Sequence, residues 1–168
     1  MDAAEVLVVV RACRAAGVEV WIDGGWCVDA LLGRQTREHG DLDVAVGRQE
    51  VCRLRERLAV LGYAAESRAG ATEWNFVLAR SGGGAVDVHV FEFDGDGNHI
   101  HGIEYPNDSF SGVGVIGGEQ VRCISPERMF QFKTAYPPAA KDLLDVQAMS
   151  ERFGFALPAS HRTGPSRS

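Results

Sequence analysis

The chain has 168 residues, of which 45% are hydrophobic and 24% charged, and its formal net charge is −6. This length allows one domain with a sizeable core and is short for two. The acidic balance argues against a protein that coats nucleic acid, because such proteins usually present a basic surface. No apolar stretch approaches membrane-spanning length and no signal peptide opens the sequence, so we expect a cytoplasmic protein without membrane or nucleic-acid partners.

Apolar periodicity and turn residues predict alternating helices and strands. In chain order they are a helix at 3–16, a strand at 18–23, a helix at 26–32, a strand at 41–46, a helix at 49–61, strands at 63–67, 74–78, 85–91, 99–104 and 121–124, and helices from 126 and at 139–152. Glycine and serine at 106–119 predict a long surface loop, and 159–168 has the composition of a disordered tail. We therefore expect one domain over 1–158, with helices between 126 and 153 closing its site.

Three aspartates on two predicted strands are the main candidates for catalysis. Asp41 and Asp43 are one residue apart, so their side chains share a face of the strand while Leu42 and Val44 enter the core. Two adjacent carboxylates repel each other unless a cation such as Mg²⁺ lies between them. If sheet pairing brings Asp87 beside them, the three could hold two divalent ions for phosphoryl or nucleotidyl transfer. The alternative is an exposed, purely structural pair.

A double glycine, Gly24 and Gly25, precedes the second helix. A glycine turn lets backbone N–H groups approach an anion, and a helix N-terminus attracts negative charge. Arg37 and His39 lie just before the acidic strand and are further candidates for binding a nucleotide. Their alternatives are a surface charge for Arg37 and a loop-bracing hydrogen bond for His39.

Two other polar residues are candidates on weaker grounds. His89 shares a strand face with Asp87 and could contact substrate, although a structural polar contact is an equal alternative. Lys141 on the last predicted helix could reach a triphosphate, although most helix lysines are simply solvated.

Taken together, these motifs resemble those of small antibiotic nucleotidyltransferases of the DNA polymerase β-like superfamily. The resemblance is strongest to lincosamide nucleotidyltransferases and next to aminoglycoside 2''-nucleotidyltransferases, and it runs from about residue 5 to residue 153. The motifs that carry it are Gly24-Gly25-Trp26, the run from Arg37 to Asp43, and Val86-Asp87-Val88-His89.

The resemblance implies an α+β fold, with a mixed sheet flanked by helices and further helices at the C-terminal end. It also implies that Asp41 and Asp43 hold Mg²⁺, and that Asp87 completes the metal site or deprotonates the acceptor hydroxyl. Gly24, Gly25 and Arg37 would cradle the nucleotide phosphates.

The implied reaction transfers a nucleoside monophosphate from an NTP, with ATP expected, to a hydroxyl of a small molecule and releases pyrophosphate. One alternative keeps the fold and modifies a protein or RNA instead. Another is a nucleotide-binding protein without catalysis. Because a single small domain offers a shallow cleft, a homodimer is also an expectation.

Overall fold

The computed structural model describes residues 1–162 and forms one layered α+β unit. The helices are α1 (Ala3–Ala15), α2 (Gly24–Leu32), α3 (Val51–Val60), α4 (Pro126–Thr134) and α5 (Ala140–Phe153), with short 3-10 helices η1 (Arg48–Glu50), η2 (Asn107–Ser111) and η3 (Ala159–His161). The strands are β1 (Val20–Ile22), β2 (Asp41–Gly47), β3 (Ala64–Glu66), β4 (Asn75–Ala79), β5 (Ala85–Phe93), β6 (His99–Gly102), β7 (Gly112–Ile116) and β8 (Glu119–Cys123).

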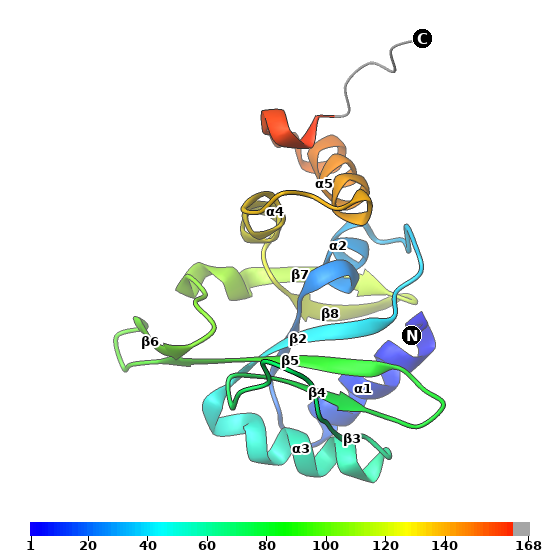
Figure 1. Ribbon diagram of the computed structural model, residues 1–168, viewed down its shortest axis with the longest axis vertical. Coiled ribbons are helices and arrows are strands. Elements are labelled where there is room, and N and C mark those ends of the chain that lie inside the picture. Colours follow the sequence, from blue (N-terminus) through cyan, green and yellow to red (C-terminus); the bar gives the residue numbers. More distant parts are fainter. Residues whose placement is uncertain (163–168) are drawn as a thin grey trace.

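All eight strands belong to one mixed sheet. Its order is β3-β4-β5-β2-β1-β8-β7, and β6 pairs with part of β5. The pairs β2–β5 and β1–β8 are parallel, and the other pairs are antiparallel. Figure 1 shows α1 and α3 on one side of the sheet and α2, α4 and α5 on the other. Within residues 1–162 no helix is both long and apolar enough to span a membrane.

Alternating side chains on the two central strands separate the core from the site. On β2, Leu42 and Val44 are fully buried, and on β5 the same is true of Val86, Val88 and Val90. The residues between them face the other side of the sheet, as the sequence pattern predicts. The parallel pairing of β2 with β5 therefore presents two rows of polar side chains on one face.

Helix α2 begins two residues earlier than the sequence pattern indicates. Asp23 is its N-cap, and the Asp23 carboxylate accepts a hydrogen bond of 2.7 Å from the backbone N–H of Gly24. The helix ends at Gly33, which adopts a left-handed φ of 68°. The double glycine is thus the first turn of the helix rather than a loop before it.

The prediction of a surface loop over 106–119 is wrong. This segment forms η2 and then β7, an edge strand that pairs with β8. The glycines reflect close packing here: a Cβ on Gly114 would lie 2.5 Å from the backbone carbon of Ala30 in α2. Small residues let helix α2 approach the strand closely. The prediction failed because a high content of glycine and serine was interpreted as a flexible loop.

The prediction of a disordered tail from residue 159 is wrong at its start. Ala159–His161 forms η3, and the His161 side chain is buried against the rest of the chain. The remainder of the predicted tail, residues 163–168, lies outside the part of the chain that the structure describes.

Candidate active site

The sheet register places the three aspartates on neighbouring strands. Asp43 on β2 is the direct register partner of Asp87 on β5, and Asp41 lies two residues earlier at the exposed start of β2. One ligand atom each from Asp43, Asp87 and His89 lie within 4.8 Å of one another. The pairing of parallel strands thus brings Asp43 and Asp87 together, whereas Asp41 is not part of this close group.

Asp43 carries the strongest electrostatic signature of this group. Burial raises the pKa of its carboxyl from 3.8 to about 6; the nearby imidazole of His89 opposes this shift, and the carboxylates of Asp41, Asp23 and Asp87 add to it. A carboxylate that burial and like charges disfavour gains most from a divalent cation. The carboxylate oxygens are hard ligands of the type that Mg²⁺ prefers, so the donor set fits this ion.

A buried hydrogen-bonded cluster supports His89 from behind. The Tyr105 hydroxyl donates to Asp23 Oδ2 at 2.5 Å, and His89 Nδ1 lies 3.2 Å from the same oxygen. His89 Nε2 is 3.8 Å from Asp87 Oδ1. Burial by itself lowers the pKa of His89, but the hydrogen bond to Asp23 and the surrounding carboxylates raise it overall. The imidazole is thus held between a buried carboxylate and the third aspartate of the site.

Asp23 and Tyr105 were not among the sequence candidates. Burial raises the pKa of Asp23, but hydrogen bonds from His89, Tyr105 and the Gly24 backbone outweigh it and lower the pKa. Asp23 stands at the start of a helix, where an aspartate is the expected N-cap. The N-cap pattern predicts only this structural role for Asp23. It does not predict the contact with His89.

Arg68, in the segment between β3 and β4, pairs with the third aspartate. Its Nη1 lies 2.8 Å from Asp87 Oδ2 and its Nη2 lies 3.3 Å from Oδ1. Asn75 also donates to Asp87 Oδ1, at 3.3 Å. The guanidinium supplies positive charge at the carboxylate where the sequence analysis expected a metal ion. No motif identifies Arg68, because its role depends on the folding of a loop.

The two glycines at the start of α2 allow the helix to approach the carboxylates. Gly24 has a φ of 59°, and a Cβ at this position would collide with the Asp43 carboxylate. A Cβ on Gly25 would lie 2.6 Å from His39 Nδ1 and would also collide with the Arg37 guanidinium. A larger residue at either position would therefore have to displace these side chains, and with glycine the helix N-terminus lies directly against the acidic strand.

A second charged network anchors the C-terminal helices above the site. The buried Asp145 carboxylate accepts hydrogen bonds from Arg37 Nε at 3.0 Å and Nη2 at 3.1 Å, and from Lys133 Nζ at 2.8 Å. Burial lowers the pKa of Lys133, but Asp145 outweighs this effect and raises it, so the ammonium stays charged. Lys133 is a cation that sequence analysis missed, and it lies with Arg37 and Lys141 on the wall of the cavity.

His39 makes the structural contact that the sequence analysis gave as its alternative. Its Nε2 lies 2.5 Å from Asp29 Oδ2, both side chains are buried, and the ring packs on Trp26 with centroids 4.6 Å apart. This bond braces the loop before β2 against α2. Its Nδ1 side still borders the cavity beside Gly25, so nucleotide binding by His39 stays a prediction.

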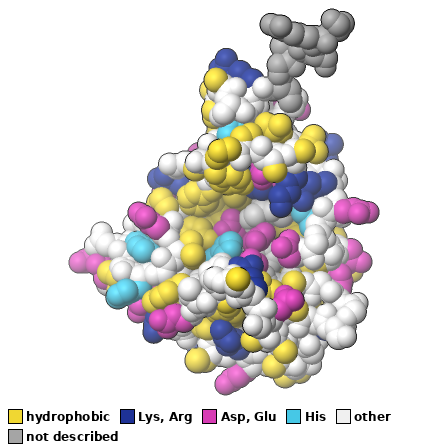
Figure 2. Space-filling model, viewed as in Figure 1, with side chains coloured by type: hydrophobic (Ala, Val, Ile, Leu, Met, Phe, Trp, Pro, Cys, Tyr) yellow, Lys and Arg dark blue, Asp and Glu magenta, His cyan; other side chains and the backbone are white. Residues whose placement is uncertain are grey.

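These groups surround one cavity of about 510 Å³ between the sheet and helices α4 and α5. Its floor carries Asp41, Asp43 and His89, and its walls carry the glycine turn and the cations described above. Figure 2 shows acidic side chains at the centre of this hollow, with basic side chains on one flank and hydrophobic ones on the other. The arrangement can hold a polyanion and a divalent cation together.

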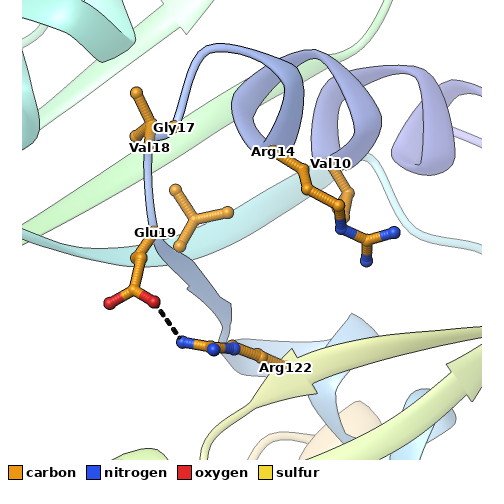
Figure 3. Close-up of a pocket in the computed structure, with 7 residues that line it drawn as sticks. Val10, Arg14, Gly17, Val18, Glu19 and Arg122 are labelled. Carbon is orange, nitrogen blue, oxygen red and sulfur yellow. Dashed lines mark hydrogen bonds and ion pairs between the residues drawn. The ribbon is translucent and has the colours of Figure 1, made fainter.

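A second hollow of about 400 Å³, lined by the end of α1, the start of β1 and Arg122, does not share these features (Figure 3). Its ion pair, between Arg122 and Glu19, is exposed, and Arg14 donates to the backbone oxygen of Gln120. None of the three aspartates lines it, whereas Asp41 and Asp43 line the cavity above β2, and Asp87 lies beside Asp43 on β5. We therefore assign the chemistry to the cavity above β2 and β5.

The sheet topology and the paired aspartates below a helix N-terminus define a nucleotidyltransferase of the polymerase β-like type. The solved structure of the lincosamide antibiotic adenylyltransferase LnuA, with lincomycin bound, matches with a TM-score of 0.75 and 26% identity, covering 88% of this chain and 95% of that one. The structure of ANT(2'')-Ia in complex with adenylyl-2''-tobramycin shares the fold, with a TM-score of 0.74 and 24% identity over 90% of this chain and 89% of that one.

Comparison of the amino-acid sequence with known protein families shows the family to which this chain belongs. The family described as aminoglycoside-2''-adenylyltransferase matches residues 5–149. A lincosamide resistance protein of Staphylococcus haemolyticus is 30% identical over 139 residues, which cover 77% of this chain and 83% of that protein. The chain belongs to this family of antibiotic nucleotidyltransferases, and the resemblance seen in the sequence motifs is confirmed.

Proposed function

We propose that this protein transfers AMP from ATP to a hydroxyl group of a lincosamide or aminoglycoside antibiotic and releases pyrophosphate. The observation that carries the proposal is the register pairing of Asp43 with Asp87 below the glycine turn of α2. Family membership supports the adenylyl group and the class of acceptor.

Each part of the cavity has a separate task in this reaction. Asp41, Asp43 and Asp87 would hold two Mg²⁺ ions, which when bound supply Lewis-acid stabilisation of the phosphate charges. The N-terminus of α2 at Gly25 would bind the phosphates, whereas the backbone N–H of Gly24 already donates to Asp23 and Gly24 serves by letting the helix approach Asp43.

The cations of the opposite wall complete the nucleotide site. Arg37, Lys133 and Lys141 neutralise the triphosphate. Arg37 and Lys133 are held in place by Asp145, so little side-chain freedom is lost when ATP binds. Their ion pairs with Asp145 also keep two cations close together before any phosphate arrives.

Transfer then needs one proton acceptor and one aligned hydroxyl. Asp87 accepts the proton of the acceptor hydroxyl, whose oxygen forms a bond to the α-phosphorus. The bond from that phosphorus to the bridging oxygen breaks, and pyrophosphate leaves with its electron pair. His89 lies 3.8 Å from Asp87 and is itself held by its contact with Asp23, so its imidazole stays close to this carboxylate. Arg68 must release Asp87 before the site is complete.

Pyrophosphate release in the presence of Mg²⁺, ATP and a panel of hydroxylated antibiotics tests the proposal. We expect acceptor-dependent release that Asp43→Asn and Asp87→Asn each reduce by about 100-fold or more, the scale of losing one preorganised charge interaction. Asp96→Asn, in the exposed turn after β5, is the matched control and retains activity. Full activity in either site variant would refute the assignment.

A further inference from the structure

A smaller apolar hollow adjoins the active-site cavity beside His89 and Phe132. It has a volume of about 210 Å³ and is lined by Asp23, His89, Ile103, Glu104, Tyr105 and Phe132. Three of these residues, Asp23, His89 and Phe132, also line the larger cavity, so the two hollows adjoin. We call the smaller hollow the annex.

The apolar side chains of the annex come from two segments, the stretch after β6 and helix α4. Ile103 follows β6, and its backbone N–H donates to the Val90 carbonyl of β5 at 2.8 Å. Tyr105 is buried and packs edge-on against Phe132 of α4, with ring centroids 5.8 Å apart. The hydroxyl of Tyr105 points to Asp23, so the ring, and not the polar end, borders the hollow.

The charges of the whole site are distributed unevenly. Arg37, Lys133 and Lys141 line the larger cavity, and among the described residues no lysine or arginine lines the annex. Of the two carboxylates in the annex, Asp23 is buried and already hydrogen-bonded, and Glu104 is exposed. The cationic side therefore suits the triphosphate, which leaves the annex, next to His89, for a part of the acceptor that carries no negative charge.

Resting on the proposed function, we propose that the annex holds an apolar substituent of the acceptor next to its reacting hydroxyl, with Glu104 pairing one ammonium group. The preferred acceptor is then an amphiphilic hydroxylated amine of the lincosamide class and not a polycationic aminoglycoside. Ammonium groups placed against Ile103, Tyr105 and Phe132 would lose hydration without gaining partners. An alkyl group in the same place removes apolar surface from water.

Direct binding and transfer measurements on the full chain test this proposal. Calorimetry with lincomycin and with tobramycin gives affinity without requiring catalysis. Mass spectrometry of the product gives kcat/KM for AMP transfer to each. We compare the wild type with Ile103→Asp, which places a charge in the annex, and with the milder Ile103→Thr. The matched control is Ile100→Asp, which changes an isoleucine of neighbouring β6 that is 45% exposed and does not line the annex.

The expected result is a preference for lincomycin that Ile103→Asp reduces by roughly tenfold to 100-fold and Ile103→Thr by a few-fold. The KM for ATP and the behaviour of Ile100→Asp stay as in the wild type. A preference for tobramycin, or an effect of Ile103→Asp on the KM for ATP alone, would overturn the proposal.

The two proposals fail in different ways. If no acceptor receives AMP but lincomycin still binds in an Ile103-dependent manner, the proposed function is wrong, and the annex is an apolar binding site for lincomycin without a role in transfer. If AMP transfer occurs and lincomycin binds no better than tobramycin, the proposed function stands and the annex proposal is wrong.

Discussion

The ionised carboxyl group of Asp43 is disfavoured both by its burial and by the negative charges around it. It is half-buried, it faces the carboxylates of Asp41, Asp23 and Asp87, and its pKa is raised to about 6. The metal-free chain therefore holds an ionised group at neutral pH that its surroundings disfavour. Binding a divalent cation relieves this cost, so the same residue couples metal affinity to stability.

Replacing Asp43 by asparagine measures how much this buried charge lowers the free energy of unfolding. Because its pKa rises from 3.8 to about 6 on folding, the folded chain binds the proton more tightly, and this group lowers the free energy of unfolding as the pH rises from about 4 to about 6. We expect Asp43→Asn to raise the free energy of unfolding of the metal-free protein by on the order of 1–3 kcal/mol at about pH 7.5 and by much less at about pH 4. Urea unfolding in a chelator measures both values.

Stabilisation of the protein by Mg²⁺ should, in contrast, require the Asp43 carboxylate. We expect added Mg²⁺ to raise the melting temperature of the wild type and of Asp96→Asn, but not that of Asp43→Asn. An asparagine variant that is less stable than the wild type at both pH values would contradict a disfavoured charge at this position.

At the scale of elements, the junction of β1 with α2 sets the position of the carboxylates. Gly24 and Gly33, at the two ends of α2, both have a left-handed φ, of 59° and 68°. A Cβ on Gly24 would meet the Asp43 carboxylate, whereas a Cβ on Gly33 has nothing within 4 Å. Substitutions at these two positions therefore share the cost of a positive φ, but only the one at Gly24 also brings a contact with Asp43.

The two alanine variants exploit this difference. Both pay about 1–2 kcal/mol for an alanine at positive φ. Gly24→Ala also displaces Asp43, so we expect it to lower kcat by about 100-fold, the scale of a misplaced reacting group. Gly33→Ala should keep a kcat close to the wild type. Steady-state kinetics together with thermal unfolding distinguish the two effects, and equal kcat losses in both variants would argue against a steric role for Gly24.

What the sequence could predict also differs from element to element. The strands β2 and β5 were predictable because alternating apolar residues fix their faces, and the pairing of Asp43 with Asp87 follows from a parallel register. Strand β7 was not predictable, because Gly114 reads as a loop residue until α2 packs on it. Arg68 and Lys133 were not predicted for a related reason. Each gains its role from a partner on another element, which only the folded chain brings near, and no local pattern records that partner.

At the scale of the whole molecule, the sheet provides a carboxylate floor and the flanking elements provide two walls of different chemistry. One wall, from the loop before β2 and from α4 and α5, is cationic and braced by Asp145. The other, from the segment after β6 and from α4, is apolar. A nucleotide and an acceptor can therefore approach the same aspartates from opposite sides. Such positioning, together with charge neutralisation, is the main source of rate in phosphoryl transfer.

The central claim is that Asp41, Asp43 and Asp87 share divalent cations in the working enzyme. Crystals grown with Mn²⁺ and a non-hydrolysable ATP analogue test it most directly, because anomalous scattering locates the ions. We expect anomalous peaks between the carboxylates of Asp43 and Asp87, with Arg68 displaced from Asp87. A nucleotide bound in this cavity with no peak at these carboxylates, and with the Arg68–Asp87 pair intact, would contradict it.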